Sequence, residues 1–163
     1  MPSPAPAASV PLLTRRRIEA EFARGLYEQM KEELGEETAR RVLARAVIRL
    51  ARAAGAQAAA QAPDGKPDLA SFRTVAEGWK AEEALTTEVL AATPEAFDFN
   101  VTRCRYAEMY RAMGLADLGV LLSCNRDGAF CEGYDPALQM TRTQTRMEGA
   151  PFCDFRFRRR AAG

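Results

Sequence analysis

The spacing of apolar residues changes at residue 97, and this change limits the folds that the chain can adopt. The stretch "FDFNVTRC", residues 97–104, alternates apolar and polar side chains along its length. In an extended chain Phe97, Phe99 and Val101 point to one side, and Asp98, Asn100, Thr102 and Cys104 point to the other. The pattern predicts a strand with one apolar face and one polar face.

Before this strand, apolar residues recur at helical spacing. Residues 14–34 are expected to form an amphipathic helix that Thr14 caps, with an apolar stripe of Ile18, Phe22, Leu26 and Met30. Further helices are expected over residues 36–60 and from 68 to about 91. The Pro/Ala-rich residues 1–13 are expected to be a disordered tail. Residues 14–92 are therefore predicted to be the helical part of the chain.

After the strand, the sequence predicts helices over residues 106–114 and 115–134, then strands over 138–147 and 152–158 joined at 148–151. In the last strand Cys153, Phe155 and Phe157 share a face. We expect the hairpin register to place on that same face Thr141, Thr143, Thr145 and Met147. Arg142 would then lie among polar side chains, because burying an arginine against phenylalanine is costly.

This order of elements predicts an α+β fold, in which N-terminal helices pack on a small antiparallel sheet with a C-terminal hairpin. We expect a single domain over residues 14–163, with its motif-bearing part at 97–158. The formal net charge of +1 gives no global field that would attract nucleic acid or a membrane surface. The short basic run at residues 15–17 is interpreted as a solvated flank.

The sequence contains no histidine. Ser-His-Asp and Cys-His pairs are therefore excluded within one chain, and acid–base chemistry must come from Asp, Glu, Cys, Tyr or Lys. We find no apolar run that could span a bilayer and no signal-peptide pattern, so a cytoplasmic protein with reduced thiols is expected. No C-x-x-C spacing occurs, and no metal or cofactor is predicted.

The four cysteines are Cys104, Cys124, Cys131 and Cys153. Each could be a small buried hydrophobe, which is a common fate of free cysteine. Cys104 differs, because it lies on the polar side of its strand just before a predicted helix. A helix N-terminus, together with Arg103 and Arg105, would lower the pKa of this thiol and activate it.

Cys124, Asp127 and Cys131 follow one another at helical positions i, i+3 and i+7 and so share one helical face. Asp127 is either a surface acid at a helix end or a partly desolvated carboxyl with a raised pKa, able to deprotonate a water molecule. Arg126 is expected to point away from this face. Arg142 is the better candidate for a guanidinium partner, although an arginine on a strand is usually at the surface.

The order of "FNVTRCRYAEMYRAMG", "LLSCNRD" and "TRTQTRMEGAPFCDFRFR" resembles the L-2-amino-thiazoline-4-carboxylic acid hydrolase family over about residues 97–158. The resemblance implies a hydrolase that opens a small carboxylate-bearing cyclic amidine to N-carbamoyl-cysteine. The turn G-x-P-x-C-x-F at 149–155 is also similar to that of 4-vinyl-reductase-like domains. This second likeness leaves open a small-molecule-binding or sensory role without catalysis.

The resemblance also implies roles for individual residues. Asp127 would be the general base or the partner of the protonated amidine, and Cys104 or Cys124 would be the nucleophile or the acid. Arg142 or Arg103 would bind the substrate carboxylate. The remaining candidates are Asn100 and Thr102 for substrate binding, and Cys153 and Asp154 as secondary site residues. A homo-oligomer is left open.

Overall fold

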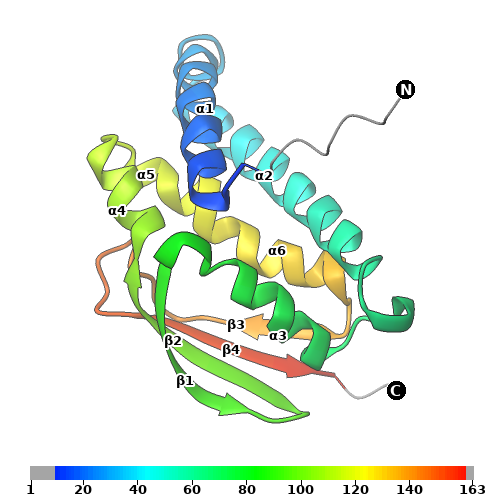
Figure 1. Ribbon diagram of the computed structural model, residues 1–163. Coiled ribbons are helices and arrows are strands. Elements are labelled where there is room, and N and C mark those ends of the chain that lie inside the picture. The colour runs from blue at the N-terminus through cyan, green and yellow to red at the C-terminus, as the bar shows by residue number, and fades with distance from the viewer. Residues whose placement is uncertain (1–9, 161–163) are drawn as a thin grey trace, which may run out of the picture.

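The computed structural model describes residues 10–160, which fold into helices packed on an antiparallel sheet (Figure 1). The helices are α1 (Leu12–Leu34), α2 (Glu36–Ala59), α3 (Leu69–Gly78), α4 (Arg105–Ala112), α5 (Ala116–Gly119) and α6 (Asn125–Tyr134). The strands are β1 (Leu85–Ala92), β2 (Ala96–Cys104), β3 (Leu138–Thr141) and β4 (Cys153–Arg159), in the spatial order β1-β2-β4-β3. The predicted α+β class is confirmed.

One face of the sheet is aromatic and is covered by helices. Phe97 and Phe99 of β2 lie beside Phe157 and Phe155 of β4, and the rings of Phe99 and Phe155 stack 5.0 Å apart. Phe72 of α3 packs on Phe157 from above. In Figure 1, α3 and α6 lie across this face, with α1 and α2 farther out. The apolar side predicted for "FDFNV" is therefore the buried side.

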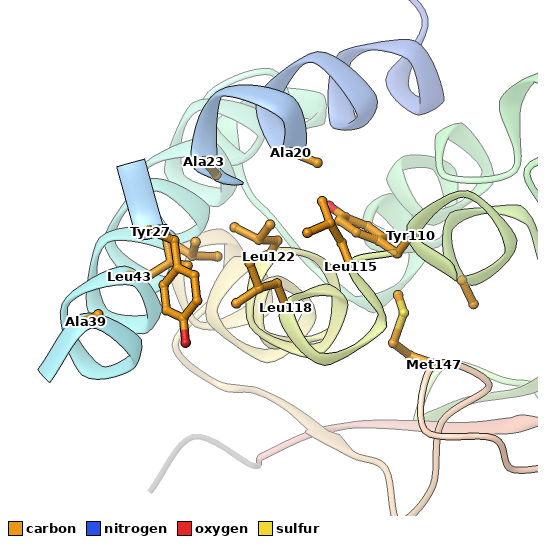
Figure 2. Close-up of a cluster of buried hydrophobic side chains, with 12 residues drawn as sticks. Ala20, Ala23, Tyr27, Ala39, Leu43, Tyr110, Leu115, Leu118, Leu122 and Met147 are labelled. Atoms are coloured by element: carbon orange, nitrogen blue, oxygen red, sulfur yellow. The ribbon is translucent and has the colours of Figure 1, made fainter. Parts of the chain in front are cut away.

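A second core lies between the helices. Ala20, Ala23 and Tyr27 of α1 are buried against leucines of the segment 115–122, as Figure 2 shows. The predicted stripe on α1 is therefore wrong: Ile18, Phe22 and Leu26 are exposed, Phe22 by 76%, while Met30 is partly buried. The small alanine side chains let α1 approach its neighbours closely, so they form the packing side.

Helices α2 and α6 cross at two glycines. A Cβ atom added to Gly55 would lie 2.1 Å from the Phe130 carbonyl oxygen, and one added to Gly133 would lie 2.1 Å from that of Arg52. No side chain fits at either position, so the two backbones touch. This contact fixes α6, which carries Asp127, against the helical layer.

The structure corrects the predicted N-terminus and the predicted third helix. Of the tail predicted over residues 1–13, residues 1–9 lie outside the described residues, and α1 begins at Leu12 after Pro11, with Thr14 inside it. Helix α3 ends at Gly78, and residues 85–92 form strand β1 instead. Glu82 and Glu83 have left-handed backbone angles (φ 58° and 56°), which separate the helix from the strand.

The structure also corrects the predicted hairpin. Strand β3 stops at Thr141, and Met140 pairs with Phe157 while Thr141 pairs with Arg156. The pairing is one residue out from the predicted register, so Met140 shares the aromatic face and Thr141 does not. Arg142 is the next residue on the inner side, and its guanidinium lies 5.0 Å from the centre of the Phe155 ring. Within residues 10–160, no helix is long and apolar enough to cross a membrane.

Candidate functional site

A cavity of about 100 Å³ lies between the inner face of the sheet and the helices. Helices, strands and the segments between them all contribute to its wall. The wall combines aromatic and aliphatic groups with thiols, guanidiniums and one carboxyl. The lining residues are Leu12, Arg16, Trp79, Leu85, Val101, Cys104, Tyr106, Ser123, Cys124, Arg126, Asp127, Phe130, Arg142, Met147, Cys153 and Phe155. An engineered apolar cavity of about 150 Å³ accepts benzene, so this smaller space is far too small for a peptide.

Asp127 and Arg142 form an ion pair in this wall. Arg142 Nη1 donates to Asp127 Oδ2 at 2.5 Å, and Arg142 Nη2 donates to the Cys124 carbonyl oxygen at 3.0 Å. The side chain of Asp127 is 25% exposed, and that of Arg142 is 12% exposed. Burial raises the pKa of Asp127, and the positive charge of Arg142 opposes that shift. The arginine predicted to lie among surface polar groups is thus an inward-facing partner of the carboxyl.

Local backbone structure places Asp127 at this position. Residues 120–124 form a π-helical turn between α5 and α6, and Asp127 lies in the first turn of α6. Such turns often occur at functional sites, because they shift the side chains that follow relative to a regular helix. On the other side, Asp154 accepts hydrogen bonds from the backbone N–H groups of Thr143 and Gln144, both at 2.9 Å. These bonds hold the loop that follows Arg142.

Three of the four thiols line the cavity: Cys104, Cys124 and Cys153. Cys104 was predicted on the polar face, but the register shift between Thr86 and Thr87 leaves Thr102 unmatched and turns Cys104 inward. Burial raises the pKa of Cys104 to about 11, although its sulfur accepts a hydrogen bond from the Ala107 N–H at the start of α4. The predicted lowering of this pKa is therefore wrong.

The other cavity thiols are also unactivated. Burial raises the pKa of Cys124 far above that of an ordinary thiol, and the nearby Asp127 charge adds to the shift. Burial likewise raises the pKa of Cys153, whose sulfur accepts from the Arg146 N–H at 3.1 Å. At neutral pH the cavity therefore presents neutral thiols, which are weak nucleophiles.

Two guanidiniums in the cavity wall were not expected. Arg16 lies in the basic run that was interpreted as a solvated flank, and Arg126 was expected to point away from the site. Their side chains are only 18% and 16% exposed, and both donate to Glu19 Oε2, at 2.6 and 3.1 Å. A signal existed for Arg16, because it precedes Ala20, Ala23 and Tyr27 on the buried side of α1 at the spacings i, i+4, i+7 and i+11.

Four of the predicted site residues lie outside the cavity lining. Arg103 pairs with Glu108 at the surface, with Nε 2.8 Å from Oε1. The other three make contacts elsewhere: Asn100 accepts from Arg156, Thr102 donates to the Thr86 carbonyl oxygen, and Asp154 holds the 143–144 loop. Arg103, Asn100 and Thr102 are therefore not part of the proposed site. Asp154 affects it only by holding the loop that follows Arg142. Among residues 10–160, no three His, Cys, Asp or Glu side chains are grouped so as to hold a metal ion.

Comparisons with known proteins bear on the family and the fold of the chain. The model of the L-2-amino-thiazoline-4-carboxylic acid hydrolase family matches residues 15–157. No curated protein matches the sequence. The crystal structure of the phenol-responsive sensory domain of the transcription activator PoxR with phenol is similar, at 13% identity and a TM-score of 0.50, over 86% of this chain and 73% of that chain. That likeness shows the fold alone. The family match extends over α1 to β4, and the chain belongs to the L-2-amino-thiazoline-4-carboxylic acid hydrolase family.

Proposed function

We propose that this protein hydrolyses a small cyclic amidine that bears a carboxylate, such as 2-amino-thiazoline-4-carboxylate, to N-carbamoyl-cysteine. The observation that carries the proposal is the Asp127–Arg142 pair in the wall of a cavity of about 100 Å³. The family name supplies the reaction class, and the cavity supplies a carboxyl with a raised pKa in a small, mostly apolar space.

In the proposed reaction, water adds to the ring carbon between nitrogen and sulfur. Asp127 takes a proton from this water, because a carboxylate with a raised pKa is a stronger base than an exposed one. The tetrahedral intermediate then collapses with cleavage of the C–S bond. Asp127 returns the first proton to the departing sulfur, and the hydroxyl proton of the intermediate passes to the ring nitrogen as the carbonyl forms. Both protons of the water therefore end in the product, which gains one molecule of water.

Arg142 keeps this carboxyl in position during the reaction. It occupies Asp127 Oδ2, and among residues 10–160 no group donates a hydrogen bond to Oδ1, which is left for the water or for the amidine. The thiols of Cys104 and Cys124 contribute a neutral and polarisable lining, since their raised pKa values disfavour a covalent thioester-like intermediate. We also expect the protein to act in a reducing compartment such as the cytoplasm, because its cysteines are free.

The test is incubation of the purified protein with 2-amino-thiazoline-4-carboxylate. Free thiol in the protein-free filtrate and a product heavier than the substrate by one water are the expected results. Cyclic ureas and the corresponding oxazoline serve as comparison substrates that report on the ring. Saturable binding without product would refute hydrolysis of this ring and would favour the non-catalytic ligand-binding role instead.

A further inference from the structure

Arg142 is predicted to bind the substrate carboxylate, but both terminal nitrogens of its guanidinium are already engaged. One nitrogen bonds to Asp127, another bonds to the Cys124 carbonyl oxygen, and the guanidinium lies over the Phe155 ring. A carboxylate placed against Arg142 would also lie beside the carboxyl of Asp127, and two like charges repel. The anionic end of the substrate therefore needs another cation in the cavity.

Two other arginines line the cavity, Arg16 from α1 and Arg126 from α6. They donate to the same oxygen of Glu19, which brings the two guanidiniums together. Arg126 uses its Nε for the Leu122 carbonyl oxygen. Among the described residues, no acceptor is assigned to Arg126 Nη1 or to Arg16 Nη2.

The charge of this end of the cavity favours an anion. Arg16 and Arg126 bring two positive charges, and Glu19 balances one of them. Glu19 is 40% exposed and is not part of the lining, whereas both guanidinium side chains are mostly buried. A carboxylate of a ligand in the cavity would neutralise the remaining charge through charge-assisted hydrogen bonds.

We propose that Arg16 and Arg126 form the carboxylate-binding subsite of the cavity, with Glu19 holding the two guanidiniums in place. This inference rests on the proposed function and assigns its substrate an orientation. The carboxylate lies toward α1, and the amidine carbon lies toward Asp127. The subsite selects small rings that carry a carboxylate over their uncharged analogues.

The test measures binding without turnover. Thiazole-4-carboxylate and the isosteric thiazole-4-carboxamide are titrated into the wild-type protein by calorimetry, and the carboxylate should bind more tightly. Arg16→Gln should weaken binding of the carboxylate by about tenfold or more and leave that of the carboxamide unchanged, because one charged contact is lost. The carboxylate affinity of Arg16→Lys should lie between that of the wild type and that of Arg16→Gln, since lysine keeps the charge but lacks the planar guanidinium.

Two further variants separate this subsite from a general charge effect. Arg17→Gln removes the same charge from the neighbouring, exposed position (64% exposed) and should change neither affinity. Glu19→Gln keeps an acceptor but removes the negative charge, so it should tighten binding of the carboxylate several-fold. The subsite is refuted if the wild-type protein binds the carboxylate no more tightly than the carboxamide. It is also refuted if Arg17→Gln weakens binding of the carboxylate as much as Arg16→Gln does.

Kinetics with 2-amino-thiazoline-4-carboxylate distinguish failure of the subsite from failure of the proposed function. Arg16→Gln should raise KM with kcat nearly unchanged, as expected for a group that binds ground state and transition state alike. Hydrolysis with an unchanged KM in this variant would retain the function and refute the subsite. Carboxylate-selective binding without hydrolysis would retain the subsite as a property of a binding protein.

A separate observation concerns the outer side of α1. Ile18, Phe22 and Leu26 are exposed by 56%, 76% and 48%, although they are large and apolar. Apolar patches of this kind are typical of interaction surfaces. Phe22 and Leu26 lie two residues to either side of residue 24, and the position that mirrors Ile18 is the partly buried Met30.

Two residues of α1 with opposite charge also lie at equal distances from residue 24. Arg15 and Glu33 lie nine residues to either side of residue 24, and the 18 residues between them make five turns, so both lie on one side of the helix. Two α1 helices that pack antiparallel would place Arg15 of each beside Glu33 of the other. A parallel arrangement would bring the two Arg15 side chains together. The surface is therefore complementary to a second copy of itself.

We infer that α1 mediates a two-fold symmetric dimer of this chain, with Phe22 and Leu26 at its centre. Sedimentation velocity between 1 and 100 µM should show a species of twice the 17.9 kDa chain mass. Phe22→Glu should give a monomer, whereas Val89→Glu, at an exposed apolar position on β1, should leave the dimer intact.

A charge exchange tests the antiparallel arrangement. Arg15→Glu and Glu33→Arg should each weaken the dimer, and the double variant should restore it, with a smaller effect at high salt. A wild-type protein that stays monomeric at 100 µM would refute the inference. So would a dimer that persists in Phe22→Glu, because it would use another face.

Discussion

Replacing Arg142 by methionine tests whether the ion pair in the cavity has the energetics inferred from its burial. The substitution keeps an unbranched side chain over Phe155 but removes both hydrogen bonds of the guanidinium. Asp127 is then left without a cation at 2.5 Å in a site where it is only 25% exposed. The protein must either tolerate an unpaired carboxylate or bind a proton.

The expected loss of stability follows from the surroundings of Asp127. Removing one partner of a buried ion pair costs about 3–5 kcal/mol. Because part of Asp127 faces the cavity and can be hydrated, we expect the lower end, about 3 kcal/mol, or a decrease in Tm of about 6–12 °C. Arg158→Met is the matched control: Arg158 pairs with Asp98 on the other face of the sheet and is 50% exposed, so its loss should be about 1 kcal/mol or less.

The dependence of this loss on pH gives a sharper result. Burial raises the pKa of Asp127 above its value in the unfolded chain, so the native state binds more protons between these two pKa values. Stability therefore decreases as pH rises through that interval. Without Arg142 the pKa of Asp127 rises further and the interval extends upward. The difference between the variant and the wild type should be small near pH 4 and largest at neutral pH.

Urea unfolding of the wild type, of Arg142→Met and of Arg142→Met combined with Asp127→Asn, at intervals between pH 4 and pH 8, measures these effects. Neutralising the carboxyl should recover most of the loss at pH 7. A loss that does not change with pH, or no recovery in the double variant, would show that Arg142 stabilises the protein through packing alone.

Asp127→Asn should abolish hydrolysis with a native circular-dichroism spectrum, and full activity in this variant would remove Asp127 from the mechanism. Cys104, with a pKa raised from 9.0 to about 11, should react with iodoacetamide about a hundredfold more slowly at pH 7 than an ordinary thiol. Replacing both Cys104 and Cys124 by alanine should leave hydrolysis within about tenfold of wild type, since a thiolate is not required; a complete loss in a folded variant would restore a catalytic role for a thiol. Gly55→Ala should lower stability by about 3 kcal/mol or prevent folding, because a Cβ there lies 2.1 Å from a carbonyl oxygen, whereas Gly25→Ala, with open space around it, should raise stability by about 0.5–1 kcal/mol; equal Tm values would contradict the backbone contact.

Local sequence patterns predicted the elements whose packing depends on one repeating spacing. The alternation at residues 97–101 predicted the buried face of β2, and the helical spacing of Cys124 and Asp127 predicted that both reach one side of the helical segment 115–134. These predictions are correct because the local helix or strand period alone decides the direction of each side chain.

The errors arose where a single-residue change in backbone register decides which way a side chain points. The pairing of Met140 with Phe157 turns Arg142 inward, and the unmatched Thr102 does the same for Cys104. Neither shift has a local sequence signal, since both depend on contacts with another strand. The stripe at Ile18 predicts the wrong packing side for α1, because large apolar side chains are usually buried whereas α1 packs through alanines.

The sequence predicts an outward Arg142 because an arginine packed against phenylalanine is unfavourable, and the structure does not remove that energetic cost. A buried ion pair is commonly no more stabilising than apolar side chains of the same volume. Stability alone therefore gives no reason to keep Asp127 and Arg142 in the wall of an otherwise aromatic and thiol-rich cavity. A reaction that needs a carboxyl of raised pKa does give such a reason, because the same desolvation that weakens the pair makes the carboxylate a stronger base. If the reasoning is right, an apolar replacement of both residues yields a protein that is as stable as the wild type, or more so, and that has lost hydrolysis entirely.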